Sequence, residues 1–170
     1  MPASELGDPT MKKMAPLVAL AILLAIQSAF AASTGGAGAL ALAALVAEHS
    51  PLLTHRDKDV MARMFDGKLN FSFPANKKIS VLADSVVCRA SDVDISAHSC
   101  ELTFGAKKRV LSARKAHELY ATVAEAGVQP DGAAGSIFES LSHLACTIDP
   151  NEVKQRAGGG ADCQFTPGAP

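Results

Sequence analysis

The side chains best suited to chemistry are four cysteines and the two histidines that stand beside them. His98 lies two residues before Cys100, and His143 lies three residues before Cys146. Imidazole and thiolate are ligands that zinc accepts, so these pairs are candidate metal ligands wherever the cysteines stay reduced. Oxidised cysteines form disulfides instead and cannot bind a metal. The choice between the two chemistries therefore depends on the compartment in which the protein folds.

The N-terminal region has the pattern of a secretory signal peptide. A basic pair, Lys12-Lys13, precedes an apolar run at residues 15–26, and Ala29 and Ala31 provide the small side chains that signal peptidase requires. We therefore predict a signal peptide over residues 11–31, with cleavage after Ala31. Since the apolar run is shorter than the roughly 20 residues of a membrane span, we expect contact with the membrane only transiently, during export.

The residues ahead of this signal fit export poorly, because Glu5 and Asp8 would place negative charge before the basic pair. We expect residues 1–10 to be an upstream extension and Met11 to be the true start, with Met1 as the alternative. A second apolar run at residues 37–47 leaves an uncleaved membrane anchor open as another interpretation.

Export sets the expectations for the rest of the chain. We expect an N-terminal helical segment over residues 32–50, a single globular α+β domain over 51–166 and a short tail over 167–170. The protein is expected in the periplasm or outside a bacterial cell. The 16 basic and 17 acidic residues give a net charge of −1. This balance argues against a nucleic-acid partner, which requires an excess of basic charge.

In an oxidising compartment the four cysteines are expected to form two disulfides. Three pairings are possible, and the sequence favours neighbours: Cys88 with Cys100, and Cys146 with Cys163. Each of these pairs flanks a connection rich in polar or turn-forming residues, so each bridge would staple one β-hairpin. Closing a loop of this size stabilises a fold by roughly 3 kcal/mol.

Three segments have the apolar spacing and the end signals of helices. Residues 37–48 are rich in Ala and Leu, which favour helix. A second helix is expected to begin after Thr54 as its N-cap and to end at Gly67. From residue 112 the apolar residues recur with a helical period, which predicts the main core helix. Its apolar stripe consists of Ala116, Leu119, Tyr120 and Val123.

Alternating apolar residues elsewhere indicate an antiparallel meander of strands. Leu69, Phe71 and Phe73 predict a first strand, expected to form a hairpin with a second strand over residues 78–88. Further strands are expected at residues 99–104 and 109–111. One face of the second strand is expected to carry Ile79, Val81, Ala83 and Val87.

Residues 136–148 carry conflicting signals. Ser136 and Glu139 form a capping box and the apolar residues fit a helical stripe, whereas the Ser, Cys and Thr content favours a strand. We predict a short helix as far as His143, followed by a strand that pairs with residues 161–166. A single long strand is the alternative.

Together these elements predict an α+β fold. It consists of a small antiparallel sheet with helices packed on one face, and two of its hairpins are stapled by disulfides. Such a scaffold holds its polar connections at the ends of rigid strands, where exposed loops commonly bind partners.

No local motif of a hydrolase, a zinc protease or a phosphate-binding loop is present in the sequence. We therefore predict a non-enzymatic binding or inhibitor module, with no cofactor and no metal, whose stapled loops hold a protein or an envelope ligand. The candidate interaction surface lies in the connection between the first two cysteines, with the tip at residues 151–161 beside it. Its residues are Arg89, Asp92, Asp94 and His98.

Two alternatives stay open. A small envelope hydrolase or metal-dependent enzyme would use His98 or His143 with carboxylates that the fold brings near. A structural envelope protein would look the same in sequence as a binding module, and a search for partners distinguishes the two.

Overall fold

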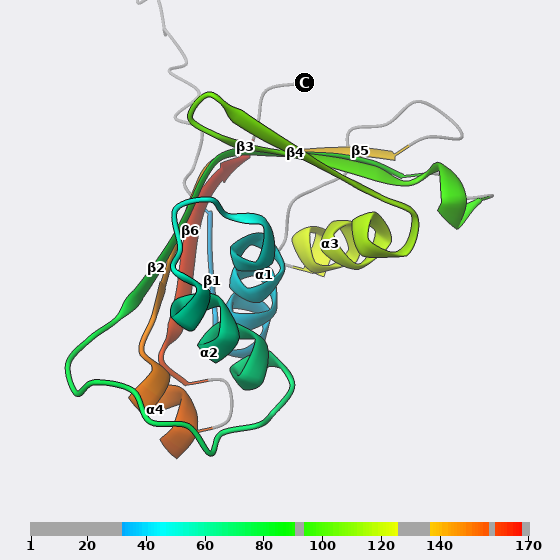
Figure 1. The fold of residues 1–170 in the computed structure, drawn as a ribbon. Helices are drawn as coiled ribbons and strands as arrows, with labels where there is room; N and C mark the ends of the chain where they lie inside the picture. Colours follow the sequence, from blue (N-terminus) through cyan, green and yellow to red (C-terminus); the bar gives the residue numbers. More distant parts are fainter. Residues whose placement is uncertain (1–31, 91–93, 126–136, 157–158, 168–170) are drawn as a thin grey trace, which may run out of the picture.

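A computed structural model describes residues 32–90, 94–125, 137–156 and 159–167. The predicted upstream extension and signal peptide lie outside these ranges. In the described part, six strands form one antiparallel sheet in the order β1-β6-β5-β2-β3-β4, with helices against it (Figure 1). The strands are β1 (Ala32–Gly35), β2 (Ile79–Ala90), β3 (Ser99–Phe104), β4 (Lys107–Ser112), β5 (Ile137–Ile148) and β6 (Ala161–Pro167). The helices are α1 (Gly36–His49), α2 (His55–Phe65), α3 (Ala113–Glu125) and α4 (Pro150–Gln155), with a 3-10 turn η1 (Ile95–Ala97).

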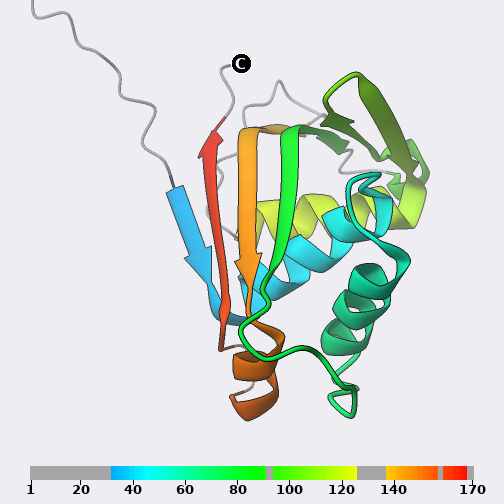
Figure 2. The same cartoon turned by 60° about the vertical axis from the view of Figure 1, so that its left-hand side comes forward.

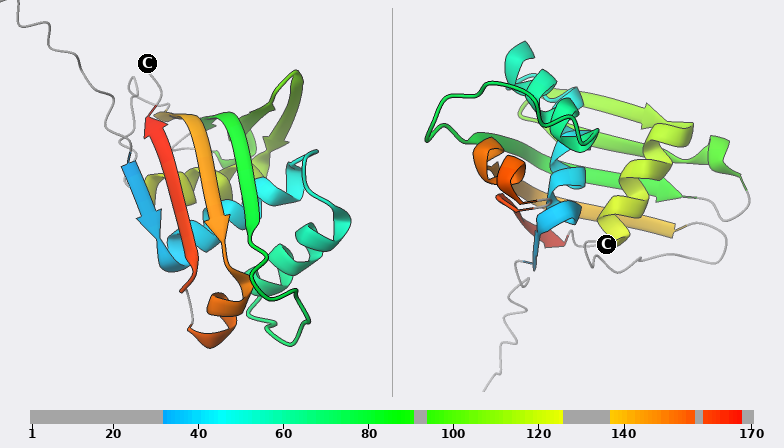
Figure 3. Two further views of the ribbon diagram at one scale, coloured as in Figure 1. Left: turned by 90° about the vertical axis from the view of Figure 1, so that its left-hand side faces the viewer. Right: turned by 90° about the horizontal axis from the view of Figure 1, so that it is seen from below.

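Helices α1, α2 and α3 lie on the concave face of the sheet (Figures 1 and 3). Helix α1 is central, because it packs against the sheet and has α2 on one side and α3 on the other. The predicted α+β class, with helices on one face of an antiparallel sheet, is confirmed. Within the described ranges no helix combines the length and the apolar character needed to cross a bilayer. The largest fully buried side chains include Phe165, Leu42, Met61, Leu119 and Leu144.

The sheet is bent (Figures 1 and 2), and β5 carries a bulge against β6, where the register shifts between Ser142 and Ala145. At the same position along β5, the ladder with β2 is interrupted without a change of register. Ala83 of β2 pairs with Leu144 of β5, and the ladder between these strands then resumes only beyond Asp84 and His143. His143 has a φ of 58°, a left-handed conformation that an ordinary strand residue avoids. Bulges of this kind increase the local bend and twist of a sheet, and here the bend wraps the sheet around α1 and α3.

The alternation of β2 shifts where its ladder with β5 is interrupted, and this changes which side chains face the helices. Val86 is 1% exposed, whereas Val87 is half-buried and lies beside Arg89 and Glu101 on the outer face. The prediction that Val87 shares the buried face with Ala83 was therefore wrong. A regular strand has a side-chain period of two, whereas Ala83 and Val86 are both buried with two residues between them.

Residues 137–148 form one continuous strand, so the predicted short helix ending at His143 was wrong and the alternative of a long strand holds. The bulge explains the helix-like spacing, since Leu141 and Leu144 are both buried with only two residues between them. Strand β5 pairs with β2 on one side and β6 on the other. Two ladders of backbone hydrogen bonds outweigh a local helical preference.

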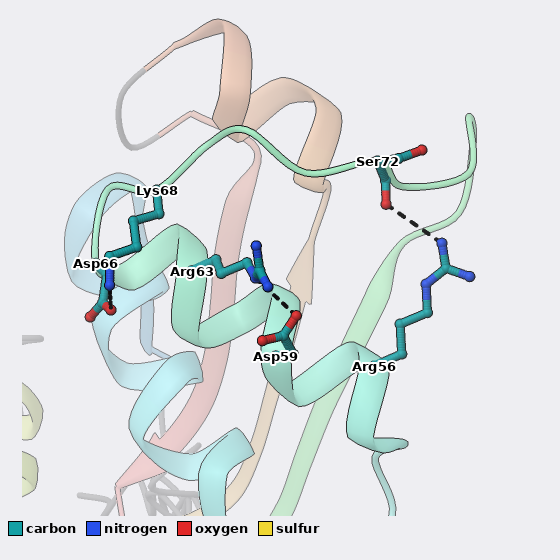
Figure 4. Close-up of polar contacts among 6 residues, drawn as sticks. All are labelled: Arg56, Asp59, Arg63, Asp66, Lys68 and Ser72. Carbon is teal, nitrogen blue, oxygen red and sulfur yellow. Dashed lines mark hydrogen bonds and ion pairs between the residues drawn. The ribbon is translucent and has the colours of Figure 1, made fainter.

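Residues 68–74 form no strand, and the predicted hairpin with β2 was wrong. Strand β2 pairs with β5 along its length and with β3 only over residues 85–89, so residues 68–74 leave the second edge of the first half of β2 without a strand. Side chains of α2 and α4 donate hydrogen bonds to backbone carbonyl groups of this segment instead. Arg56 Nη2 donates to the Ser72 carbonyl oxygen at 3.5 Å (Figure 4), and Lys154 Nζ donates to that of Phe71 at 2.8 Å. The apolar side chains of the segment still pack against the core, which explains their alternation in the sequence.

Both predicted disulfides are present. Cys88 and Cys100 stand directly opposite each other on β2 and β3, and Cys146 and Cys163 do so on β5 and β6. None of the four side chains is more than 1% exposed. Each bridge staples one antiparallel pair of strands, as the spacing predicts, and their presence indicates an oxidising compartment.

The connection between β5 and β6 contains helix α4. Asp149 caps this helix, accepting from the backbone N–H groups of Asn151 at 3.0 Å and Glu152 at 3.3 Å. Its own N–H donates to the Gly160 carbonyl oxygen at 2.7 Å, which closes the connection. Gly160 has a φ of 70°, and a Cβ there would lie 2.6 Å from the Glu152 Cβ, so this position requires glycine.

Helix α2 begins after the predicted cap. The Asp57 N–H donates to Thr54 Oγ1 at 3.2 Å, and the Thr54 hydroxyl donates back to Asp57 Oδ2 at 2.8 Å. Gly67, with a φ of 70°, follows the last turn as predicted. Asp57 is 8% exposed, and Lys77 Nζ lies 2.8 Å from its Oδ1. This ion pair ties the long segment before β2 to the first turn of α2.

The Asp57 ion pair predicts an acid-sensitive contribution to stability. The Lys77 ammonium, and next the Thr54 hydroxyl, hold the pKa of Asp57 below its ordinary value of 3.8 against the opposing effect of burial. Because the pKa is lower in the folded protein, the stabilisation is complete above the unfolded-state value and is lost as the pH falls through the folded-state value. We expect Asp57→Asn to cost roughly 1 kcal/mol at pH 7 and almost nothing near pH 2.

The measurement is urea denaturation across that pH range. Asp59→Asn is the matched control on the same helix, because Asp59 is 59% exposed and its ion pair with Arg63 lies in solvent. A stability difference for Asp57→Asn that did not shrink toward low pH would contradict the role given to Lys77.

Candidate interaction groove

Of the four residues predicted to form an interaction surface, the structure describes Arg89, Asp94 and His98. Arg89 is exposed on the outer face of β2, and Asp94 is exposed at η1, where its carboxylate accepts from the Ser96 N–H at 2.8 Å. His98 is only 4% exposed, and Asp92 lies outside the described residues. The predicted surface stays a prediction, and its His98 is buried.

His98 packs against α3 through two rings of that helix. Its Nδ1 lies 3.2 Å from the Nδ1 of His117, with the ring centroids 4.9 Å apart, and Tyr120 meets it edge-on at 6.1 Å. A hydrogen bond between two imidazoles requires one N–H donor and one lone-pair acceptor. The contact holds the stapled β2–β3 connection against α3, which gives this histidine a structural role.

The second predicted histidine, His143, is exposed at the bulge of β5. It therefore lies in a different environment from buried His98. Cys100 and Cys146, the neighbouring thiols of the two histidines, are both in disulfides and cannot be thiolate ligands. Among the residues that the structure describes, no group of three or more His, Cys, Asp or Glu side chains is arranged to hold a metal ion.

Two depressions lie along α1 in the helical layer, with volumes of about 420 Å³ and about 370 Å³, and Phe65 lines both of them. We call the two depressions together the α1 groove. Its floor is the solvent side of α1, and its walls come from α2 and α3. The lining residues from α1 are Ala37, Gly38, Leu40, Ala41, Ala44, Leu45 and Glu48, and those from the flanking helices are Lys58, Asp59, Ala62, Phe65, Asp66, Glu118 and Glu125.

The floor of the α1 groove is apolar because α1 has almost no polar face. Between Gly36 and Glu48 the helix consists of Ala, Leu, Val and Gly alone. One side of it is buried against the sheet, while Ala41 and Leu45, one turn apart, are only partly buried on the other. A helix that is apolar all round is typically covered on every side. Helix α1 is covered on three, by the sheet, α2 and α3.

Phe65 is the largest apolar side chain of the groove and is 51% exposed. It is the last residue of α2 and lines both depressions. Small side chains share these linings with it, Ala62 in one depression and Ala41 in the other. A half-exposed phenylalanine beside an apolar floor is typical of a surface that a partner covers.

Carboxylates line the edges of the groove, and three of them form ion pairs that lie in solvent. Asp59 pairs with Arg63 at 2.9 Å, and Asp66 pairs with Lys68 at 2.9 Å (Figure 4). On the α3 side, Glu118 pairs with Arg114 at 3.1 Å. Such exposed pairs contribute about 0 to 1 kcal/mol, so the carboxylates can exchange partners at little cost.

Glu48 closes one end of the groove. Lys115 Nζ lies 2.5 Å from its carboxylate and holds the pKa of Glu48 below its ordinary value of 4.5. The neighbouring His49 has its pKa lowered below 6.5, first by burial of its ring. At neutral pH this end of α1 therefore presents an ionised carboxylate beside a neutral imidazole, and the groove keeps its acidic edge.

Sequence reasoning missed the α1 groove because three elements far apart in the chain form it. One signal was present, namely a helix at residues 36–47 with no polar side chain. Such a helix needs a second cover in addition to the sheet. Comparisons with protein-family models, with curated proteins and with solved structures give no match.

Proposed function

We propose that this protein is an exported, disulfide-stapled binding module that holds a segment of a partner protein in the α1 groove. The observation that carries the proposal is the apolar surface of α1 that α2 and α3 leave uncovered. The half-exposed ring of Phe65 lies beside it. Contiguous apolar surface with a polar rim is the usual anatomy of a protein-binding patch.

The disulfides support the export part of the proposal. Buried bridges between β2 and β3 and between β5 and β6 indicate an oxidising compartment, such as the periplasm or the extracellular space. The signal peptide predicted over residues 11–31 leads to the same compartment.

The chemistry of the groove favours binding over catalysis. Among its described lining residues are small apolar side chains, one aromatic ring, carboxylates and a single lysine, and none of them is a serine, cysteine or histidine. The lysine, Lys58, donates to the Glu48 carbonyl oxygen at 3.1 Å, so its ammonium is engaged with the end of α1. A nucleophile with an adjacent base is the usual sign of covalent catalysis, and this lining does not supply one.

The test is capture of a partner by the exported protein and by two matched variants. Ala41→Arg fills the floor of the groove, and Ala106→Arg places the same side chain in the exposed turn between β3 and β4. We expect a partner that the wild type and Ala106→Arg retain equally, with recovery reduced about tenfold or more by Ala41→Arg. Thermal melting of the variants establishes that all of them are folded.

The same experiment includes Arg89→Ala, because Arg89 belongs to the surface predicted from the sequence. A partner that depends on Arg89 and is indifferent to Ala41→Arg would overturn the groove proposal and favour the β2–β3 connection. A search that returns no partner sensitive to either variant would instead favour a structural envelope protein. Intact-mass measurement of the same material reports whether cleavage follows Ala31 and whether two disulfides are present.

A further inference from the structure

We infer that the segment held in the α1 groove is an amphipathic α-helix with lysine or arginine on its flanks. This inference rests on the proposed function and specifies the chemistry of the partner. Three properties of the groove carry it: its length and floor, the state of the backbone that forms the floor, and the sign of the charges along its edges.

The length of the groove suits a short helix. Its floor extends from Ala37 to Glu48, which is roughly 16 Å along the helix axis or about three turns. The side chains of that floor are small, with Gly38, Ala41 and Ala44 among them. Small side chains let two helix axes approach to the near end of the usual 8 to 10 Å range. A helix seated there would complete the burial of α1.

The backbone of the floor selects a helix over an extended segment. Every interior N–H and C=O of α1 is bonded within the helix, so the floor offers no backbone donors or acceptors to a ligand. A strand laid on it would leave the N–H and C=O groups that face the floor without partners, and unpaired buried groups are costly. A helix brings its own backbone bonds and presents only side chains, the recognition mode of amphipathic helices in apolar grooves.

The charges that face the groove select a basic partner. Five carboxylates line it, whereas Lys58 is the single cation among its described lining residues. The basic partners of these carboxylates lie outside the lining; Arg114, for example, is 88% exposed beside Glu118. Lysines or arginines on the flanks of an incoming helix can therefore replace them. The five carboxylates belong to Glu48, Asp59, Asp66, Glu118 and Glu125.

Phe65 supplies the anchor of the interface. Its exposed ring lines both depressions of the groove. An aromatic side chain that becomes buried at the centre of an interface commonly dominates the affinity. Leucine or a similar side chain at positions i and i+4 of the partner would straddle this ring, with the basic side chains directed toward the walls.

The test uses two synthetic helices of about 14 residues, ~21 Å long, each with a leucine stripe at helical spacing. One carries lysine at its flanking positions and the other carries glutamate. Calorimetric titration of the exported protein measures both. We expect the lysine helix to bind at least about tenfold more tightly than the glutamate helix, and to lose affinity as salt is raised.

Variants of the protein locate that binding. Phe65→Ser and the double change Asp59→Asn with Glu118→Gln are each expected to weaken the lysine helix about fivefold or more. The control is Glu101→Gln, which removes an exposed and paired carboxylate on the outer face of the sheet. Equal binding of the two helices, or binding of the lysine helix that all three groove substitutions leave unchanged, would overturn the inference.

The outcomes separate this inference from the proposed function. If Ala41→Arg abolishes capture of a partner but the protein does not prefer the lysine helix, the inference of a basic helix is rejected. The proposed function as a binding module is then retained. If the lysine helix binds in the groove but Ala41→Arg leaves capture of the partner unchanged, the groove does prefer basic helices. The proposal that it holds the natural partner is then rejected.

Discussion

Replacing Cys146 and Cys163 together with alanine is expected to lower the free energy of unfolding by about 3 to 5 kcal/mol. The bridge closes a loop with a sequence separation of 17 and holds β5 to β6. Without it the unfolded chain gains conformational entropy, and the two truncated side chains, both buried, leave a gap in the core. A domain of this size has a total stability of about 5 to 15 kcal/mol, so the loss is a large share.

Urea denaturation of the double variant and of the wild type measures this difference. The second bridge is the matched comparison: Cys88→Ala with Cys100→Ala opens a loop with a separation of 12, and the loop-entropy estimate predicts an effect smaller by only a few tenths of a kcal/mol. A loss below about 1 kcal/mol for the β5–β6 bridge would show that the fold does not depend on an oxidising compartment.

Val86→Lys is expected to destabilise the fold by about 3 to 5 kcal/mol, whereas Val87→Lys is expected to change its stability by less than about 1 kcal/mol. Val86 is 1% exposed beneath the helices, so a lysine there would bury an unpaired ammonium. Val87 faces outward and pairs in register with Glu101, so a lysine there gains a cross-strand carboxylate. Both substitutions replace valine with lysine, and they differ only in the face of the sheet on which the new side chain lies.

Urea denaturation compares the two variants. Val86→Thr serves as a milder companion, since it keeps the shape of the side chain and buries only a hydroxyl, at a cost of about 1 to 3 kcal/mol. If Val87→Lys proved the more damaging of the pair, the shift in alternation between Ala83 and Val86 would be wrong, and β2 would alternate without interruption.

The bulge in β5 marks the limit of what could be predicted from the sequence for this fold. Thr54 and Gly67 determine the ends of α2 through contacts with residues close to them in the chain, so both ends could be predicted from the local sequence. A bulge depends on two strands at once. It gives Leu141 and Leu144 a spacing of three, which resembles a helix, and only the partner strands β2 and β6 reveal the true period. The disulfide pairing was predictable because each bridge joins neighbours along the chain.

The phenylalanines before β2 illustrate a second limit. Phe71 and Phe73 alternate as strand residues do, yet Lys154 and Arg56, from distant helices, supply the hydrogen bonds that a neighbouring strand would have supplied. Alternating apolar residues indicate that one side of a segment is buried, but they do not indicate which groups form hydrogen bonds with its backbone. The candidate site lay beyond prediction for the same reason, since Phe65, Ala41 and Glu118 become neighbours only after α1 is seated.

The first strand of the described chain pairs with the last: Ala32 of β1 stands opposite Phe165 of β6. This contact joins residues at the two ends of the domain, so it has the largest sequence separation in the sheet. Contacts of that kind are slow to form, because nearly the whole chain must be brought together first. During synthesis or translocation, β1 has no partner until β6 has emerged. The sheet edge beside α1 would therefore close last, and a chain cut short before β6 would expose β1 and the underside of α1 together.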